Sequence, residues 1–191
     1  MWPRESKRVL GFTLVELMVT LGVLAILLVA AVPSFIDFFD KNRVRGAADG
    51  VISLISNARA EAVKTDLSVN IALAGSGTSW CVGANAATPP SGGNPAGPAS
   101  ACDCTDVTQC RVAGQRSAVE IGAYPDVQVG ALPVALTFDS KLGTIVPLGT
   151  RSVTLTSPRG NYDLAVEVNA LGQARLCVPA GTRSIAGVSS C

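Results

Sequence analysis

The first third of the chain carries two hydrophobic patterns in succession. Between Leu17 and Ile36 the only polar side chains are Thr20 and Ser34. A helix of about 20 residues is about 30 Å long, which is the thickness of the hydrocarbon core of a bilayer. The first pattern therefore predicts a transmembrane helix over about residues 14–36.

The second pattern is amphipathic and continues the same helix past Pro33, a residue that should kink it. Apolar residues recur at intervals of three and four, as one face of a helix requires: Val44, Ala47, Ala48, Val51, Ile55, Ala58 and Ala62. Charged residues are expected to take mostly the opposite side: Asp40, Lys41, Arg43, Arg45, Asp49 and Glu61. The pattern predicts a helix that ends near residues 64–66 and packs one face on a globular head.

After Asp66 the pattern changes to short β-rich runs separated by Gly, Pro, Asn and Asp. The candidate strands are 68–73, 78–82, 117–121, 134–138, 152–156, 163–168 and 174–178. Several alternate apolar and polar residues, which favours an antiparallel sheet with one solvated face. The tract 83–100 has no periodicity and is expected to be a surface loop. The predicted fold class is α+β, with a long N-terminal helix packed on an antiparallel β-sheet head.

Composition argues against catalysis. The chain has 191 residues, of which 48% are hydrophobic and 15% charged, and it has no histidine. Histidine is the commonest general base and a frequent metal ligand, so Ser–His and Cys–His mechanisms are excluded. Ser–Lys chemistry would need Lys64 or Lys141, and nothing in the sequence singles either out. We expect no enzymatic activity and no cofactor.

The charge distribution indicates an orientation in the membrane. The formal net charge is +1, and Arg4, Lys7 and Arg8 all precede Gly11. Basic residues on the N-terminal side of an apolar run predict a cytoplasmic N-terminus and an exported head. Without residues 1–11 the net charge becomes −1, so the remaining chain has little long-range attraction for a polyanion.

Six cysteines follow the apolar run, in the part expected to be exported. An even number of cysteines in an oxidising compartment favours disulfides. Cys177 and Cys191 flank a tail rich in Gly, Ser and Ala, which would fray unless tied down. We therefore expect a Cys177–Cys191 bridge that contributes on the order of 3 kcal/mol.

The other four cysteines are expected to pair among themselves within residues 81–110. A Cys102–Cys104 ring would be strained. This leaves Cys81 paired with Cys102 or Cys104, and Cys110 paired with the other. A metal site is the alternative interpretation of this cluster. Its spacing matches no common zinc pattern, so the sequence favours disulfides and no metal.

Glu16 is the only charged residue between Gly11 and Asp37. A carboxylate near the start of an apolar run is costly in lipid unless it is paired or functional. An ordinary secretory signal, cleaved after its apolar region near Ala30 or Ala31, would have no use for it. The simplest partner of Glu16 is a positive group on a neighbouring subunit.

The segment Gly11-Phe12-Thr13-Leu14-Val15-Glu16-Leu17-Met18 resembles the class III signal of type IV pilins and type II secretion pseudopilins. The resemblance implies that a prepilin peptidase cleaves after Gly11 and that the new terminal Phe12 is N-methylated. It also implies that Glu16 pairs with the Phe12 amine of an adjacent subunit, so that each charge offsets the desolvation of the other.

A second resemblance covers most of the remaining chain. The stretch 57–64 at the helix end, Phe138-Asp139-Ser140 with Gly143, and the stretch 172–177 resemble the GspH/FimT family. The family fold would be a long helix against antiparallel strands. Its members are minor subunits of type IV pili or of the type II secretion pseudopilus, and the stretch 32–35 and the cysteine-bearing C-terminal region look more like the pilus branch.

These observations define the expected organisation. A leader (1–11) would be cleaved, a pilin helix (12–66) would follow, and a β head domain (67–191) would complete the chain. The predicted function is that of a minor pilin involved in pilus assembly, with a GspH-type pseudopilin as the alternative. The protein would be a single-pass subunit of the bacterial inner membrane with its head in the periplasm. Its partners would be the peptidase, inner-membrane lipid and other pilins of a periplasmic or extracellular filament.

DNA uptake is a weaker third hypothesis. Some FimT-type pilins bind DNA through a C-terminal Gly-Arg-x-Arg motif. The sequence here is Gly172-Gln173-Ala174-Arg175, which retains the second arginine, and the region beyond it adds Arg183. Since affinity depends on the number of phosphates neutralised, two arginines predict weak binding at most.

Overall fold

A computed structural model describes residues 11–89, 99–130 and 135–191. The predicted leader lies outside these residues except for Gly11, as do residue 134 of one predicted strand and residues 90–98 of the predicted loop. Contacts divide the chain into two compact units, which meet between Phe38 and Phe39. The helix residues from Phe39 onward thus belong to the same unit as the β head.

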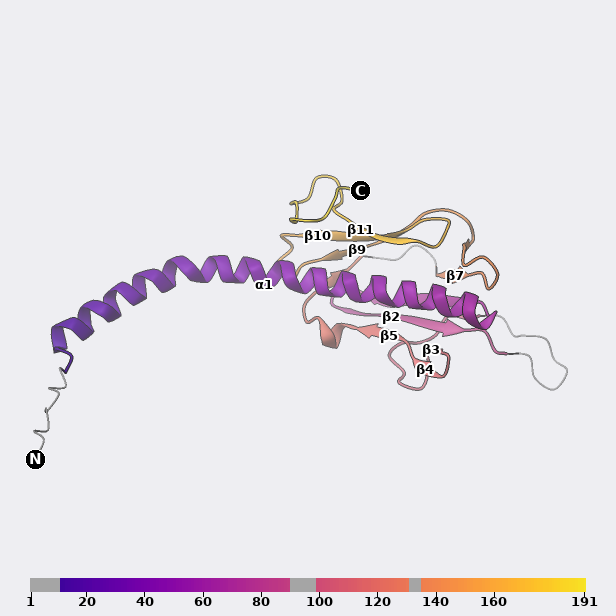
Figure 1. Cartoon of the computed structure of the whole chain (residues 1–191), viewed down its shortest axis with the longest axis horizontal. Coiled ribbons are helices and arrows are strands. Elements are labelled where there is room, and N and C mark those ends of the chain that lie inside the picture. Colours follow the sequence, from indigo (N-terminus) through magenta and orange to yellow (C-terminus); the bar gives the residue numbers. More distant parts are fainter. Residues whose placement is uncertain (1–10, 90–98, 131–134) are drawn as a thin grey trace, which may run out of the picture. The chain divides into compact units, whose positions relative to one another are not determined.

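One long helix, α1 (Leu14–Thr65), runs through both units (Figure 1). Thr13 caps its start, because its hydroxyl accepts a hydrogen bond of 3.2 Å from the backbone N–H of Glu16. At the other end Asp66 adopts a positive φ of 54°, which stops the helix close to the predicted position.

The membrane prediction concerns the first part of α1. Among the described residues no single straight helix is long and apolar enough to cross a bilayer. The segments Leu14–Val29 and Ser34–Thr65, which meet at a bend of 41°, satisfy the test together by length and composition. The bend includes position 33. The attribution of the kink to Pro33 stays a prediction, since its side chain is not among those described.

The head contains two antiparallel sheets (Figure 1). The first has the order β5-β2-β1-β7-β8, with strands Ala118–Glu120, Ser79–Ala86, Val69–Ser76, Leu136–Phe138 and Ile145–Val146. The second has the order β11-β10-β9-β6, with strands Ala174–Cys177, Asp163–Val168, Arg151–Thr156 and Gln128–Val129. A small hairpin joins β3 (Arg111–Val112) to β4 (Gln115–Arg116), and a 3-10 turn, η1 (Ile121–Ala123), follows β5.

The α+β class is confirmed, and each of the seven predicted strand regions contains a strand. Two expectations were wrong. The strands form two sheets rather than one, and residues 83–86 extend β2 instead of opening a loop. Antiparallel pairing along all eight residues of β1 and β2 explains the extension, because Val69 pairs with Ala86 at its far end. The strands β3, β4, β6 and β8 were not predicted, since two residues are too few to show a period.

The apolar face of α1 packs on both sheets. All seven predicted positions of the face are buried. They share one core with residues of the two sheets, including Phe138 of β7 and Leu155 of β9. Asp40, expected on the opposite side, is only 3% exposed, which corrects the prediction. Its burial is explained by hydrogen bonds to the turn between β9 and β10, described below.

Candidate functional site

The N-terminal element combines an exposed aromatic residue with a carboxylate in the first helical turn. Phe12 is 82% exposed and precedes the capping residue Thr13. Glu16 lies in the first turn of α1, where free backbone N–H groups give the helix end a partial positive charge. The Thr13–Glu16 spacing is that of a capping box, a contribution of Thr13 that the sequence analysis missed.

The remainder of the first unit offers an apolar surface. Most large hydrophobic residues between Leu14 and Val32 are half or more exposed. Nothing within the described chain covers them, and water is an unfavourable environment for such a surface. A helix of this kind requires lipid or other apolar helices around it, and Glu16 is the charge that would have to be matched there.

Three stretches far apart in the sequence meet at the C-terminal end of α1. The Nε–H group of Arg59 donates a hydrogen bond of 2.9 Å to the carbonyl oxygen of Gly143. Gly172 lies against the same carbonyl and against the ring of Phe138, with a positive φ of 75°. These residues come from the three stretches singled out in the sequence, so the structure joins them into one junction.

An open groove lies beside this junction. It is lined by Ser56, Arg59, Val63, Leu142 and Gln173, among others. Leu142 is 73% exposed, and Val63 is about half exposed. The lining combines these apolar side chains with the polar side chains of Ser56, Arg59 and Gln173.

Asp40 anchors α1 to the head near the boundary between the two units. Its carboxylate accepts a hydrogen bond of 2.9 Å from the Ser157 hydroxyl and one of 3.2 Å from the backbone N–H of Arg159. The Ser157 oxygen in turn accepts bonds from the backbone N–H groups of Asn161 and Tyr162. This site was not expected from the sequence, because a charge among other charges gives no sign of burial.

The two arginines considered for DNA binding lie in different elements. Arg175 is on β11, and its Nε donates a hydrogen bond of 2.7 Å to Glu167 on β10. Arg183 is exposed in the tail that follows β11. The ion pair places a carboxylate against Arg175, where a phosphate would have to bind.

The six cysteines form three disulfides: Cys81–Cys104, Cys102–Cys110 and Cys177–Cys191. The first two correspond to one of the two pairings that the sequence left open, in which Cys104 is the partner of Cys81. The third ties the tail to β11, and two backbone hydrogen bonds, from Val178 to Ser189 and from Cys191 to Val178, hold the tail in place. No cluster of three or more metal-binding side chains occurs in the described part of the chain.

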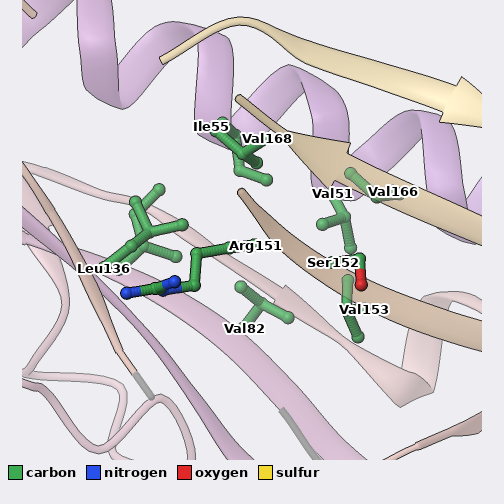
Figure 2. A pocket seen from close by; sticks show the side chains of 10 residues that line it. Val51, Ile55, Val82, Leu136, Arg151, Ser152, Val153, Val166 and Val168 are labelled. Atoms are coloured by element: carbon green, nitrogen blue, oxygen red, sulfur yellow. The ribbon is translucent and has the colours of Figure 1, made fainter. Parts of the chain in front are cut away.

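A small cavity lies between α1 and the two sheets. Val51 and Ile55 reach it from α1, Val82 and Leu136 from the first sheet, and Val153, Val166 and Val168 from the second (Figure 2). Its volume is about 30 Å³, which is room for about one water molecule. The Nε atom of Arg151 is buried at this cavity without a hydrogen-bond partner among the described residues. The cavity is too small for an organic substrate.

Two family models match the chain, one near the N-terminus and one over the head. Residues 6–32 match the prokaryotic N-terminal methylation motif. None of the curated proteins matches the chain. Two crystal forms of the type IV minor pilin FimU of Pseudomonas aeruginosa are similar in structure. One is 17% identical over 73% of this chain and 91% of FimU, with a TM-score of 0.46. The other is 16% identical over 69% and 90%, with a TM-score of 0.42.

The head gives the broader match. Residues 47–172 match the family described as Type II transport protein GspH. This segment includes the buried face of α1 from residue 47 onward, both sheets except for β11, and the junction of Arg59, Gly143 and Gly172. The match covers well over half of the chain, and the chain therefore belongs to the GspH family.

Proposed function

We propose that the protein is a minor pilin, a non-catalytic subunit that takes part in the assembly of a type IV pilus. The observation that carries the proposal is Glu16, the single charge of an apolar helical segment whose side chains are exposed. After cleavage behind Gly11, the Phe12 amine of a neighbouring subunit would provide the opposite charge. In an apolar environment the pair would form at a defined position, because each charge is costly when it is alone.

The proposal extends to location. The first unit would anchor the protein in the bacterial inner membrane as a single pass, with the head in the periplasm. The methylation motif over residues 6–32 supports an anchored precursor. After assembly the same apolar surface would be covered by the helices of other pilins. The groove and the junction at the distal end of α1 would remain on the head.

Glu16→Ala and Glu16→Gln test the role of the carboxylate. Both variants should insert into the membrane and lose the leader normally, whereas their amount in sheared filaments should fall at least about tenfold, as expected for loss of a desolvated charge pair worth roughly 1.4 kcal/mol or more. A bulky residue at Gly11 is the processing control, because it should block cleavage. Normal filament content of Glu16→Ala would contradict the proposal.

A GspH-type pseudopilin of the type II secretion system is the second candidate, and the family match of the head favours it. The two candidates predict different phenotypes in the source organism. Deletion of a minor pilin should remove surface pili and leave protein secretion intact. Deletion of a pseudopilin should do the reverse. Electron microscopy of pili and assay of a secreted enzyme in the same deletion strain decide between them.

A further inference from the structure

The two disulfides beside β2 of the first sheet are interleaved in the sequence. Cys81 bonds to Cys104 and Cys102 bonds to Cys110, so the second bridge begins inside the first loop and ends outside it. The tail bridge Cys177–Cys191 joins neighbours in the order of cysteines. The chain therefore contains one interleaved cluster and one simple loop, which serves as an internal reference.

The unfolded chain does not favour the interleaved pairing. The native bridges span 23 and 8 residues. The alternative, Cys81–Cys102 with Cys104–Cys110, closes loops that are each two residues shorter. Closure probability falls roughly as the 3/2 power of loop length, so the alternative is favoured by about 1.8-fold. Between these two pairings, the native one would arise in only about one third of molecules.

The folded head, in contrast, selects one pairing. Cys81, Cys102, Cys104 and Cys110 are all buried and pack together. They surround Gly83 of β2, where an added methyl group would overlap Cys110 Sγ and lie 3.0 Å from Cys102 Sγ. The close approach of both bridges to the strand fixes which sulfurs meet. The pairing found in the folded head thus differs from the pairing that loop closure in the unfolded chain favours.

A wrongly paired molecule has no means of correcting itself. Disulfide exchange begins with attack by a thiolate. All six cysteines are bonded, and the described chain contains no free cysteine. The alternative pairing also uses all four cysteines of the cluster, so the attacking thiolate must come from outside. We propose that the head acquires its cluster through a thiol–disulfide isomerase with an accessible cysteine thiolate.

The exchange is redox-neutral. The isomerase thiolate attacks Cys102 of the Cys81–Cys102 bridge, which forms a mixed disulfide and releases the Cys81 thiolate. The Cys81 thiolate attacks Cys104, which forms the Cys81–Cys104 bridge and releases the Cys110 thiolate. The Cys110 thiolate attacks Cys102 in the mixed disulfide, which forms Cys102–Cys110 and regenerates the isomerase thiolate. The initial bridges require an oxidant, a protein disulfide that takes two electrons and two protons per bridge.

The inference rests on the proposed function only for the oxidising compartment, and its test does not depend on export. Reduced, unfolded full-length protein is oxidised in detergent with a thiol-free oxidant, with or without a catalytic amount of a purified bacterial disulfide isomerase. Non-reduced protein is then cleaved before aspartate. The fragments 66–102, 103–105 and 106–125 separate the cysteines so that native pairing joins all three, whereas the alternative leaves 66–102 free.

The isomerase should raise the native fraction about threefold, from about one third toward completion. The yield of the Cys177–Cys191 bridge should not change. The variant Cys102→Ser/Cys110→Ser, which keeps Cys81 and Cys104, should form its bridge without the isomerase. Equal native fractions with and without the isomerase would overturn the inference, and so would isomerase dependence of the double variant. Loss of filament incorporation with correct pairing would count against the proposed function alone.

Discussion

The hydroxyl of Ser157 donates a hydrogen bond of 2.9 Å to the carboxylate of Asp40, across 117 residues of sequence. Both residues are buried, at 0% and 3% exposure. The bond connects α1 to the turn between β9 and β10, close to the point where the chain divides into its two units. Asp40 is the one charged residue of α1 that is buried as a whole in the described chain.

Removal of the Asp40 carboxylate should destabilise the head. Asp40→Ala leaves the buried Ser157 hydroxyl and the Arg159 backbone N–H without their acceptor, which should lower the free energy of unfolding by about 2 kcal/mol. Asp40→Asn retains one acceptor oxygen and should cost about half as much. The exposed Asp49 gives the matched control, since Asp49→Ala should change stability by less than about 0.5 kcal/mol. Urea unfolding of the three variants measures the differences, and equal effects of Asp40→Ala and Asp49→Ala would contradict this prediction.

Gly172 should tolerate no side chain. A methyl group there would overlap the carbonyl oxygen of Gly143 and lie 2.9 Å from the Phe138 ring, at a φ of 75°. Gly160 has a similar φ of 69° with no atom near the corresponding position. Gly160→Ala should therefore show only the backbone cost of about 1 kcal/mol, and Gly172→Ala should cost about 2 kcal/mol more. Thermal unfolding compares the pair, and equal losses would remove the close-contact explanation.

The Cys177–Cys191 bridge should stabilise the protein and keep the C-terminal tail attached after proteolysis. Cys177→Ala/Cys191→Ala should lower stability by on the order of 3 kcal/mol, the chain-entropy value for a loop of about 15 residues. Trypsin cleavage after Arg183, an exposed residue inside the loop, should separate the tail from the variant. In the native protein the same cut leaves the pieces joined until the disulfide is reduced. Mass spectrometry of non-reduced digests shows whether the tail is released from the variant and retained in the native protein. An unchanged free energy of unfolding in the variant would contradict the stabilising role.

Two carboxylates should hold the loop between Cys102 and Cys110 only above acid pH. Hydrogen bonds from the hydroxyl and backbone N–H of Thr105 lower the pKa of Asp103 below its ordinary value of 3.8. Bonds from the backbone N–H and the hydroxyl of Thr108, and from Gln109, lower the pKa of Asp106 in the same way. A lowered folded pKa means a stabilising contribution that is complete well above pH 3.8 and is lost as the pH falls through the folded value.

The amide resonances of Thr105 and Thr108 provide the local measurement for this loop. Each should titrate with a midpoint below pH 3.8, the ordinary value for an aspartate. Asp103→Asn should abolish the transition at Thr105 and leave that at Thr108. A midpoint at or above the ordinary value in the native protein would show that these hydrogen bonds do not favour the ionised form.

Periodicity explains why the helix was predicted more completely than the head. The buried positions of α1, from Val44 to Ala62, repeat at helical intervals over many turns, so each supports the others. Strands such as β6 and β8 contain two residues and carry no period. The number of sheets depends on which strand edges meet, and local sequence does not contain this information. The division into two sheets follows from pairing at long range, such as Val69 with Phe138 in the first sheet and Gln128 with Thr156 in the second.

The functional residues also differ in how far the sequence alone reveals them. Glu16 stood out because it is a charge in an apolar run, a contrast visible in sequence. Asp40 lies among Asp37, Lys41 and Arg43, and only the distant Ser157 distinguishes it. The choice between Cys102 and Cys104 as partner of Cys81 needed the position of β2, because the two cysteines are neighbours in the chain.

The junction of Arg59, Gly143 and Gly172 has a consequence for exchanging segments between members of the family. A hybrid with a crossover between residues 60 and 140 would combine the helix of one parent with the two glycine turns of another. The guanidinium of Arg59 and the carbonyl of Gly143 would then have to match in position although they had never been selected together. Hybrids should fold best when all three stretches come from one parent, so recombination ought to treat these distant segments as a single inherited block.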